Sequence, residues 1–139
     1  MTNKGKTILI VDDSVAVRQV VSMALIAAGF TMVQAVDGQE GVTMVDLNRS
    51  IDLVISDINM PKLNGIELLE QVKGKPENQA LPVLMLTTEG QTSLVKRAKE
   101  LGAVGWIVKP FKADQLVQTV ERLTRTEVRN PAEDQAAAS

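Results

Sequence analysis

Short apolar runs alternate along this chain with stretches whose apolar residues recur at helical spacing. Four of the runs, each followed by polar residues, are typical of strands that are buried on both faces, as in a parallel sheet. They are ILIV at 8–11, LVI at 53–55, VLML at 83–86 and WIV at 106–108. A weaker run at 32–36 is interrupted by Gln34 and predicts an edge strand.

The segments between these runs predict five helices. The longest apolar stripe comprises Val17, Val20, Val21, Ala24, Leu25 and Ala28. Two further stripes comprise Leu94, Val95, Ala98 and Leu101, and Leu116, Val120 and Leu123. Shorter sets, which fit helices bounded by Gly38 and Gly65, comprise Val42 and Val45, and Ile66, Leu69 and Val72.

Strand and helix thus alternate five times, which predicts an α/β sandwich with a parallel sheet and helices on both faces. Ligands of such sheets bind beyond the carboxyl ends of the strands. The polar residues directly beyond the apolar runs are Asp12 and Asp13, Asp57, Thr87 and Thr88, and Lys109. We expect these side chains to share one rim of the sheet.

Composition limits the functions that such a rim can have. The 139 residues are 45% hydrophobic, which is enough for one domain with its own core. The 15 Lys plus Arg against 17 Asp plus Glu give a net charge of -2, so we expect no nucleic-acid binding. There is no cysteine and no histidine, so a bound metal would need oxygen ligands.

The two ends of the chain suggest neither a signal peptide nor an anchor. The polar start MTNKGK leads into TILIV, which is too short for a signal-peptide core or a membrane span. We therefore expect a cytoplasmic protein without membrane insertion. Residues 1–126 are expected to form the domain, and residues 127–139 to form a mobile C-terminal tail of charged and small residues.

An ionised carboxylate such as Asp57 is costly at the end of a buried strand unless something compensates it. Three carboxylates on one rim also repel one another, unless a cation lies among them. Lys109 supplies one cation, and the oxygen-only donors suit Mg²⁺ as a second. Together with the Thr87 hydroxyl, these groups suit phosphoryl transfer to a carboxylate nucleophile.

Some of these residues also have a purely structural interpretation as helix caps. Asp12, Asp13 or Ser14 would suit the N-terminus of the first helix, where Asp and Ser are preferred. Thr87 or Thr88 would likewise suit the helix that is expected to begin near residue 91. One cap needs one such residue, however, and three stand together before the first helix.

The other two positions have structural alternatives as well. Asp57 suits an Asx turn ahead of Pro61. The long side chain of Lys109 can carry its ammonium group out to solvent. Each signal is weak alone, but several on one rim indicate a site.

Four motifs carry a resemblance to a known family. VDDS at 11–14, SDINMPKLNG at 56–65, LTTEG at 86–90 and VKPF at 108–111 resemble the receiver domain of two-component response regulators. The resemblance covers roughly residues 6–125. It implies a flavodoxin-like, doubly wound (βα)5 sandwich with the strand order 2-1-3-4-5. The most similar subgroup is that of single-domain chemotaxis regulators of the CheY type.

By this resemblance Asp57 is the phosphoacceptor, Lys109 contacts the phosphoryl oxygens and Thr87 is the switch hydroxyl, followed by Thr88. The Mg²⁺ ligands would be the carboxylates of Asp12, Asp13 and Asp57 and the backbone carbonyl of Asn59. Asn59 and Glu89 are at positions that tune autodephosphorylation by guiding or blocking the attacking water. The Lys109–Pro110 bond corresponds to the cis peptide of the family.

Trp106 departs from the family pattern. The position that is paired with the switch Thr is usually Tyr or Phe, and the bulk and indole N–H of Trp make the usual inward rotation harder. The alternative is a strand residue that packs against the last helix. Some bistable element on this face is still expected.

The resemblance implies a response regulator that takes a phosphoryl group from a sensor histidine kinase and then binds a downstream protein. Chemotaxis, with the flagellar motor switch as target, is the expected pathway, and residues 91–122 are the expected output surface. We expect a monomer, with a phosphatase as a further partner. It would catalyse its own phosphorylation and dephosphorylation without other turnover. The alternative is a phosphorelay or phosphate-sink receiver of another two-component pathway.

Two other classes fit the motifs poorly. A phosphohydrolase of the haloacid dehalogenase type needs a D-x-D pair after its first strand, whereas DIN follows the third strand here. A flavodoxin-like cofactor carrier needs a phosphate loop rich in hydroxyl residues and glycine after the first strand, where VDDS would repel a phosphate. Two Phe and one Trp also leave little to stack on a flavin.

Overall fold

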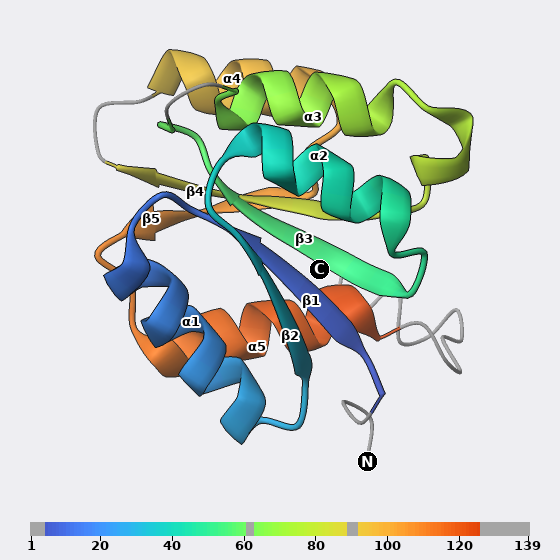
Figure 1. Cartoon of the computed structure of the whole chain (residues 1–139). Helices are drawn as coiled ribbons and strands as arrows, with labels where there is room; N and C mark the ends of the chain where they lie inside the picture. Colours follow the sequence, from blue (N-terminus) through green and yellow to red (C-terminus); the bar gives the residue numbers. More distant parts are fainter. Residues whose placement is uncertain (1–4, 61–62, 89–91, 126–139) are drawn as a thin grey trace, which may run out of the picture.

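A parallel sheet organises the chain, as the computed structural model shows for residues 5–60, 63–88 and 92–125. Its strands are β1 Thr7–Val11, β2 Thr31–Ala35, β3 Ile51–Asp57, β4 Val83–Thr88 and β5 Gly105–Lys109. They are arranged in the order β2-β1-β3-β4-β5 (Figure 1). The predicted doubly wound α/β fold is thereby confirmed, and β2 is an edge strand as expected.

The five expected helices cover both faces of this sheet. They are α1 Val15–Ala27, α2 Gly38–Leu47, α3 Gly65–Lys73, α4 Thr92–Glu100 and α5 Ala113–Thr124. Helices α1 and α5 lie on one face, and α2, α3 and α4 lie on the other (Figure 1). A short 3-10 turn, η1 Pro76–Asn78, precedes β4. None of the described helices has both the length and the apolar character that crossing a membrane requires.

Two apolar layers hold the helices to the sheet, because alternate residues of a strand point to opposite faces. The layer under α1 and α5 includes Ile8, Ile10, Leu53, Ile55, Leu84, Leu86, Val21, Leu25, Leu116 and Val120. The layer under α2, α3 and α4 includes Leu9, Val11, Val54, Met85, Val42, Val45, Leu68, Leu69 and Val72. The central strands are therefore buried on both faces, as their continuous apolar runs predict.

The expectation of burial on both faces is wrong for β5. Trp106 is 45% exposed and Val108 is 42% exposed, whereas Ile107 between them is buried. β5 pairs with β4 alone and forms the second edge of the sheet. An apolar run does not encode the place of its strand in a sheet, so the sequence pattern could not reveal this open face.

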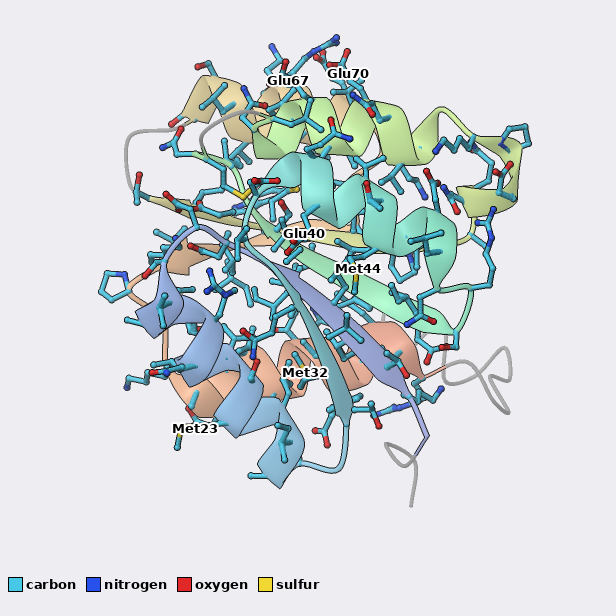
Figure 2. The ribbon with its side chains drawn as sticks, in the orientation of Figure 1. Met23, Met32, Glu40, Met44, Glu67 and Glu70 are labelled. Atoms are coloured by element: carbon cyan, nitrogen blue, oxygen red, sulfur yellow. The ribbon has the colours of Figure 1, made fainter. Side chains whose placement is uncertain are left out.

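The apolar stripe that was expected for α1 is wrong at Val20, which is 52% exposed. Val21 and Leu25 face the core instead. The outer face of α1 also exposes Val15, Met23 and Ile26, and Figure 2 shows Met23 pointing away from the sheet. This face is apolar because Arg18 is the one charged residue of the helix.

Candidate functional site

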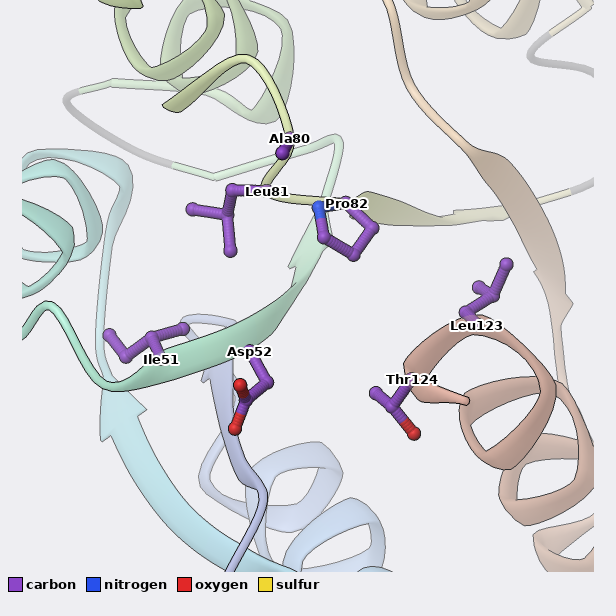
Figure 3. A pocket seen from close by; sticks show the side chains of 7 residues that line it. All are labelled: Ile51, Asp52, Ala80, Leu81, Pro82, Leu123 and Thr124. Carbon is purple, nitrogen blue, oxygen red and sulfur yellow. The ribbon is translucent and has the colours of Figure 1, made fainter. Parts of the chain in front are cut away.

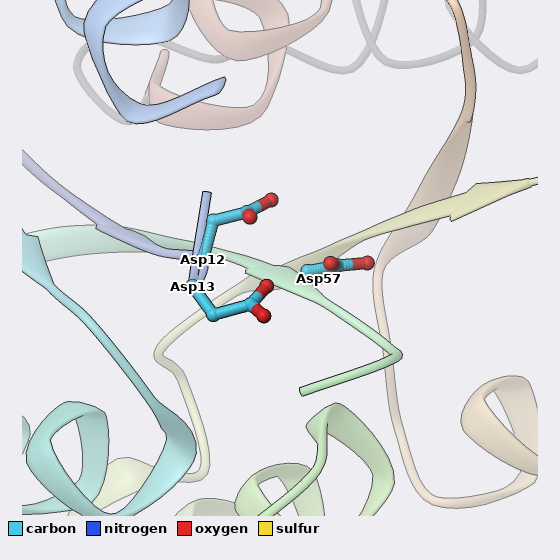
Figure 4. A group of neighbouring side chains, drawn as sticks. All are labelled: Asp12, Asp13 and Asp57. Carbon is cyan, nitrogen blue, oxygen red and sulfur yellow. The ribbon is translucent and has the colours of Figure 1, made fainter. Parts of the chain in front are cut away.

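Three carboxylates converge at the carboxyl ends of β1 and β3 (Figure 4). Asp12 and Asp13 follow β1 directly, and Asp57 is the last residue of β3. Each offers an oxygen atom, and these atoms all lie within 4.8 Å of one another. Asp12 and Asp57 are buried, whereas Asp13 is exposed. The predicted rim thus brings these three residues together.

Lys109, the last residue of β5, reaches across the rim to both buried carboxylates. Its Nζ lies 3.2 Å from Asp12 Oδ2 and 3.2 Å from Asp57 Oδ2. Its side chain is only 20% exposed. The ammonium group therefore does not extend into solvent, and the structural alternative for Lys109 does not apply.

The backbone around Asp12 is held in place by its neighbours. The Ser14 N–H donates to Asp12 Oδ1 at 2.8 Å, and the Asp12 N–H donates to the Ala35 carbonyl at 3.2 Å. The Ser14 hydroxyl caps α1 by accepting from the Val17 N–H at 3.3 Å. Because Ser14 supplies the cap, both aspartates remain available to the site.

Sequence reasoning missed the contribution of Arg18. Its Nη1 donates to the Asp12 backbone carbonyl at 2.6 Å, and its Nε donates to Gln34 Oε1 at 3.2 Å. Arg18 therefore ties the first turn of α1 to the end of β1. The available signal was its position as the single charge in an otherwise uncharged helix.

The position of Asp57 depends on the close approach of α3. A Cβ atom on Gly65, the first residue of α3, would lie 2.3 Å from the Asp57 carbonyl oxygen and 2.8 Å from Ile58 Cα. The Asn59 N–H also donates to Asp57 Oδ1 at 3.4 Å, which is the contact of the expected Asx turn. The turn and the carboxylate cluster are thus compatible, and Gly65 allows α3 to pack behind them.

The electrostatics of this cluster favour an additional cation. Burial raises the pKa of the Asp57 carboxyl above its ordinary value, and repulsion from Asp12 raises it further. The Lys109 ammonium opposes both effects. When the three aspartates are ionised, one lysine leaves two negative charges in excess. Carboxylate oxygens with an excess of negative charge suit Mg²⁺, because this ion binds carboxylates and keeps several water molecules as further ligands.

The remaining predicted positions lie at the ends of β4 and β5. Thr87 is buried and Thr88 is exposed, and Thr88 is paired in register with Lys109. The Lys109–Pro110 peptide bond is cis, as expected. Trp106 lies on the open face of β5, together with a cavity of about 510 Å³. Glu89 and the residues directly before α4 lie outside the described residues, so neither the role of Glu89 nor the helix-cap alternative for the threonines is tested.

The sequence of this chain matches a known protein family over most of its length. The family described as the response regulator receiver domain matches residues 8–121 of the chain. The chain belongs to the response regulator receiver family. The acidic cluster and Lys109 lie within the residues that this family matches.

The relatives of this receiver include chemotaxis proteins of the CheY type. It is 37% identical over 123 residues to chemotaxis protein CheY-3 of Vibrio cholerae, with 87% of this chain and 93% of that protein covered. It is 38% identical over 115 residues to the probable chemotaxis protein CheY of Rhizobium etli, with 82% and 88% covered. The structure of chemotaxis response regulator CheY4 of Vibrio cholerae superposes with a TM-score of 0.79 at 39% identity, covering 85% of this chain and 98% of that one.

Proposed function

We propose that this receiver accepts a phosphoryl group on Asp57 from a sensor histidine kinase and then signals by binding a protein. The observation that supports this most directly is the bridge from Lys109 to two buried carboxylates at the end of the sheet. A lysine held there can meet the charge of an incoming phosphoryl group. The site opens to solvent on the side of Asp13, which leaves room for a donor.

In the transfer step a carboxylate oxygen of Asp57 forms a bond to phosphorus. The bond between phosphorus and the imidazole nitrogen of the donor phosphohistidine breaks, and its electron pair stays on that nitrogen. Lys109 stabilises the negative charge on the phosphoryl oxygens, and Thr87 can donate its hydroxyl to one of them. Asp57 suits this role because β3, α3 and the Asn59 N–H fix its position.

Mg²⁺ would be held by the carboxylates of Asp12, Asp13 and Asp57 and by the backbone carbonyl of Asn59. When bound, the ion supplies the positive charge that Lys109 alone lacks in this cluster. The residues themselves orient the nucleophile. Lys109 holds Asp57 Oδ2, and the Asn59 N–H holds Oδ1, so the carboxyl plane is fixed before a donor arrives.

The protein partner would bind at the edge of the sheet that β5 forms. Thr87 and Thr88 end β4, the strand that lies between β3 and the edge strand β5. Asn59 and Glu89 are proposed to control the entry of the hydrolytic water. Trp106 and Val108 offer apolar surface to a protein partner beside the 510 Å³ cavity. Because the relatives include chemotaxis proteins, we propose chemotaxis, and hence a flagellar motor switch, as the pathway.

Intact-mass measurement after incubation with acetyl phosphate tests the proposal. We expect a gain of one phosphoryl group that needs Mg²⁺ and decays with time, and no gain in Asp57→Asn. A matched control is Asp46→Asn, which changes an exposed aspartate on α2 and should be labelled like the wild type. Labelling of Asp57→Asn on another carboxylate would refute the assignment, and no labelling of any form would indicate a receiver that works without phosphorylation.

A further inference from the structure

Arg18 contacts the backbone next to the acidic cluster, yet it pairs with none of the three carboxylates. Its Nη1 donates to the Asp12 backbone carbonyl at 2.6 Å, and its Nε donates to Gln34 Oε1 at 3.2 Å. Within the described residues it forms no ion pair with Asp12, Asp13 or Asp57. An arginine that neutralised the cluster would direct its donors at a carboxylate, because a hydrogen bond between two ions is stronger than one to a neutral oxygen. The contact with a carbonyl therefore points to control of the backbone.

A second contact keeps the guanidinium in this position. Gln34 lies on the edge strand β2, and its Nε2 donates to Ser22 Oγ at 3.2 Å. Arg18 and Ser22 are one turn apart on α1, so the Gln34 amide joins two neighbouring positions of the same helix. The planar guanidinium thus meets two acceptors in fixed places, an arrangement that a lysine does not reproduce.

The carbonyl that Arg18 holds belongs to the peptide unit that leads into Asp13. The Asp12 carbonyl and the Asp13 N–H share one plane, so the direction of the carbonyl sets the direction in which the chain enters Asp13. The neighbouring units are held by the bonds from the Asp12 N–H to Ala35 and from the Ser14 N–H to Asp12 Oδ1. Among the described residues no backbone group donates to the Asp12 carbonyl, so Arg18 alone orients this plane.

Asp13 is the carboxylate that depends most on this plane. Each oxygen of Asp12 and of Asp57 has a donor, and Lys109 supplies one of the two donors in each case. Asp13 is exposed and has no hydrogen bond or ion pair within the part of the chain that the structure describes. Figure 4 shows its carboxylate directed toward Asp57. Only its backbone and its own rotamer give it this direction.

We propose that Arg18 is a positioning residue of the Mg²⁺ site, because it fixes the Asp12–Asp13 peptide plane and so directs the Asp13 carboxylate at the ion. Arg18 has this role only if Mg²⁺ binds among Asp12, Asp13 and Asp57, as proposed above. Loss of a group that orients a metal ligand typically weakens metal binding by roughly 10–100-fold. The guanidinium charge has the opposite effect, since a cation near the site repels Mg²⁺. Positioning and charge thus predict changes of opposite sign.

Calorimetric titration of the full chain with Mg²⁺ tests the proposal. We expect Arg18→Gln to weaken Mg²⁺ binding about tenfold, although it removes a positive charge. Arg18→Lys keeps the charge and can reach one acceptor but not both, so it should recover only part of this loss. Gln34→Met removes the second acceptor without a change of charge and should weaken binding by a smaller factor. Binding by Arg18→Gln that is as tight as that of the wild type, or tighter, would overturn the proposal.

A control for charge is Arg97→Gln, which removes an equal charge from α4. Arg97 pairs with Glu70 of α3 at 3.6 Å, so this variant also loses a contact between two elements. It should bind Mg²⁺ like the wild type. Weakening equal to that of Arg18→Gln would mean that any lost surface contact loosens the site, and would refute a specific role of Arg18.

A control for loss of backbone support is Asp52→Ala. Asp52 Oδ2 accepts from the Thr7 N–H at 2.8 Å, so Asp52 also holds a backbone group of β1. It lines a cleft of about 450 Å³ at the amino ends of the strands (Figure 3). Along β3 it is roughly 17 Å from Asp57, which is beyond the screening length of about 8–10 Å at physiological salt. Asp52→Ala should lower the free energy of unfolding without weakening Mg²⁺ binding, and a tenfold weaker binding would again count against Arg18.

Two further measurements separate the role of Arg18 from the Mg²⁺ site itself. Without metal, Arg18→Gln should shift the carbonyl ¹³C resonance of Asp12 and the amide ¹⁵N resonance of Asp13, and unchanged resonances would refute the control of this peptide plane. In labelling by acetyl phosphate, Arg18→Gln should need about tenfold more Mg²⁺ for half of the maximal rate and reach the wild-type rate at saturation. A lower rate at saturation with an unchanged Mg²⁺ requirement would overturn the proposal. A wild type that does not bind Mg²⁺ would refute the metal site as well, whereas equal Mg²⁺ affinities of wild type and Arg18→Gln would refute the role of Arg18 alone.

Discussion

At the scale of single residues, the acidic site depends on one lysine shared between two buried carboxylates. Lys109 Nζ lies 3.2 Å from Asp12 Oδ2 and 3.2 Å from Asp57 Oδ2. Its single positive charge does not neutralise the negative charges of the cluster. Buried charges are tolerated only when they are paired and hydrogen-bonded. An ionised Asp57 is therefore unfavourable unless a further cation joins Lys109, and the raised pKa of its carboxyl reflects this.

The first prediction concerns the stability of Asp57→Asn in the absence of metal. Because burial raises the pKa of Asp57 in the folded state, the folded protein holds more protons than the unfolded chain between the ordinary and the raised pKa. Wild-type stability therefore falls as the pH rises through this window, and Asp57→Asn avoids this loss. Urea unfolding with EDTA should show a higher midpoint for Asp57→Asn at pH 7, and a smaller difference near pH ~4. A difference that is equal at both pH values would attribute the effect to packing instead of charge.

A second prediction concerns Gly65→Ala. The added methyl group would lie 2.3 Å from the Asp57 carbonyl oxygen, so α3 or the end of β3 must shift. We expect the free energy of unfolding to fall by about 1–3 kcal/mol, and labelling by acetyl phosphate to slow. Gly105→Ala is the matched control, because its methyl group would meet only Leu84 Cδ1 at 3.6 Å. Normal stability and labelling of Gly65→Ala would show that the contact is not needed to position Asp57.

At the scale of helices and strands, the sequence predicted the elements and their order better than their exposure. Continuous apolar runs located the central strands because those strands are covered on both faces. Asp12, Asp57 and Lys109 were placed on one rim because parallel strands end at the same edge. The exposure of Trp106 and Val20 was missed, since it depends on which element lies opposite and not on the local pattern.

The sequence pattern also did not predict which residues hold the site residues in position. Arg18 acts through the backbone carbonyl of Asp12, and Gly65 acts through the space that it leaves beside Asp57. Both effects involve backbone atoms of another segment, which carry no signature in residue type. Asp12 and Asp57 themselves were recognisable because ionisable residues directly after buried strands are chemically unusual.

The third prediction concerns the outer face of α1, which begins directly after Ser14 at the acidic site. Exposed apolar residues on the helix that begins at the proposed site of phosphoryl transfer suit contact with the donor protein, because apolar patches rimmed by polar residues mark interaction sites. Met23→Glu should slow phosphoryl transfer from a phosphorylated histidine kinase roughly tenfold, as the loss of about 1.4 kcal/mol of binding would do. Labelling by acetyl phosphate should be unchanged.

The control for this prediction is Leu47→Glu, which adds the same charge to a residue of α2 that is 78% exposed. It should leave both reactions unchanged. If Met23→Glu slowed labelling by acetyl phosphate as well, the effect would lie in the site and not in docking of the kinase.

At the scale of the whole molecule, the sheet separates two regions with different chemistry. The acidic residues and Lys109 lie at the carboxyl ends of the strands, and the cleft beside Asp52 lies at their amino ends. The charge of the chain is nearly balanced, at -2 overall, but the acidic cluster concentrates negative charge at one rim. An ion that neutralises this rim should therefore stabilise the folded state as a whole, since the unfolded chain does not hold these carboxylates together.

The last prediction concerns this stabilisation by Mg²⁺. An ion that binds the folded state only adds about 2.7 kcal/mol to the free energy of unfolding when its concentration is ~100 times its dissociation constant. We expect Mg²⁺ to raise the thermal midpoint of the wild type above that measured in NaCl of equal ionic strength. Asp13→Asn should lose most of this gain, and without metal it should be at least as stable as the wild type, because it removes one of three carboxylates that repel one another. Glu100→Gln, which neutralises an exposed acid of α4, should keep the full gain. An equal response of the two variants to Mg²⁺ would mean that the ion acts by general screening, and would argue against a site among Asp12, Asp13 and Asp57.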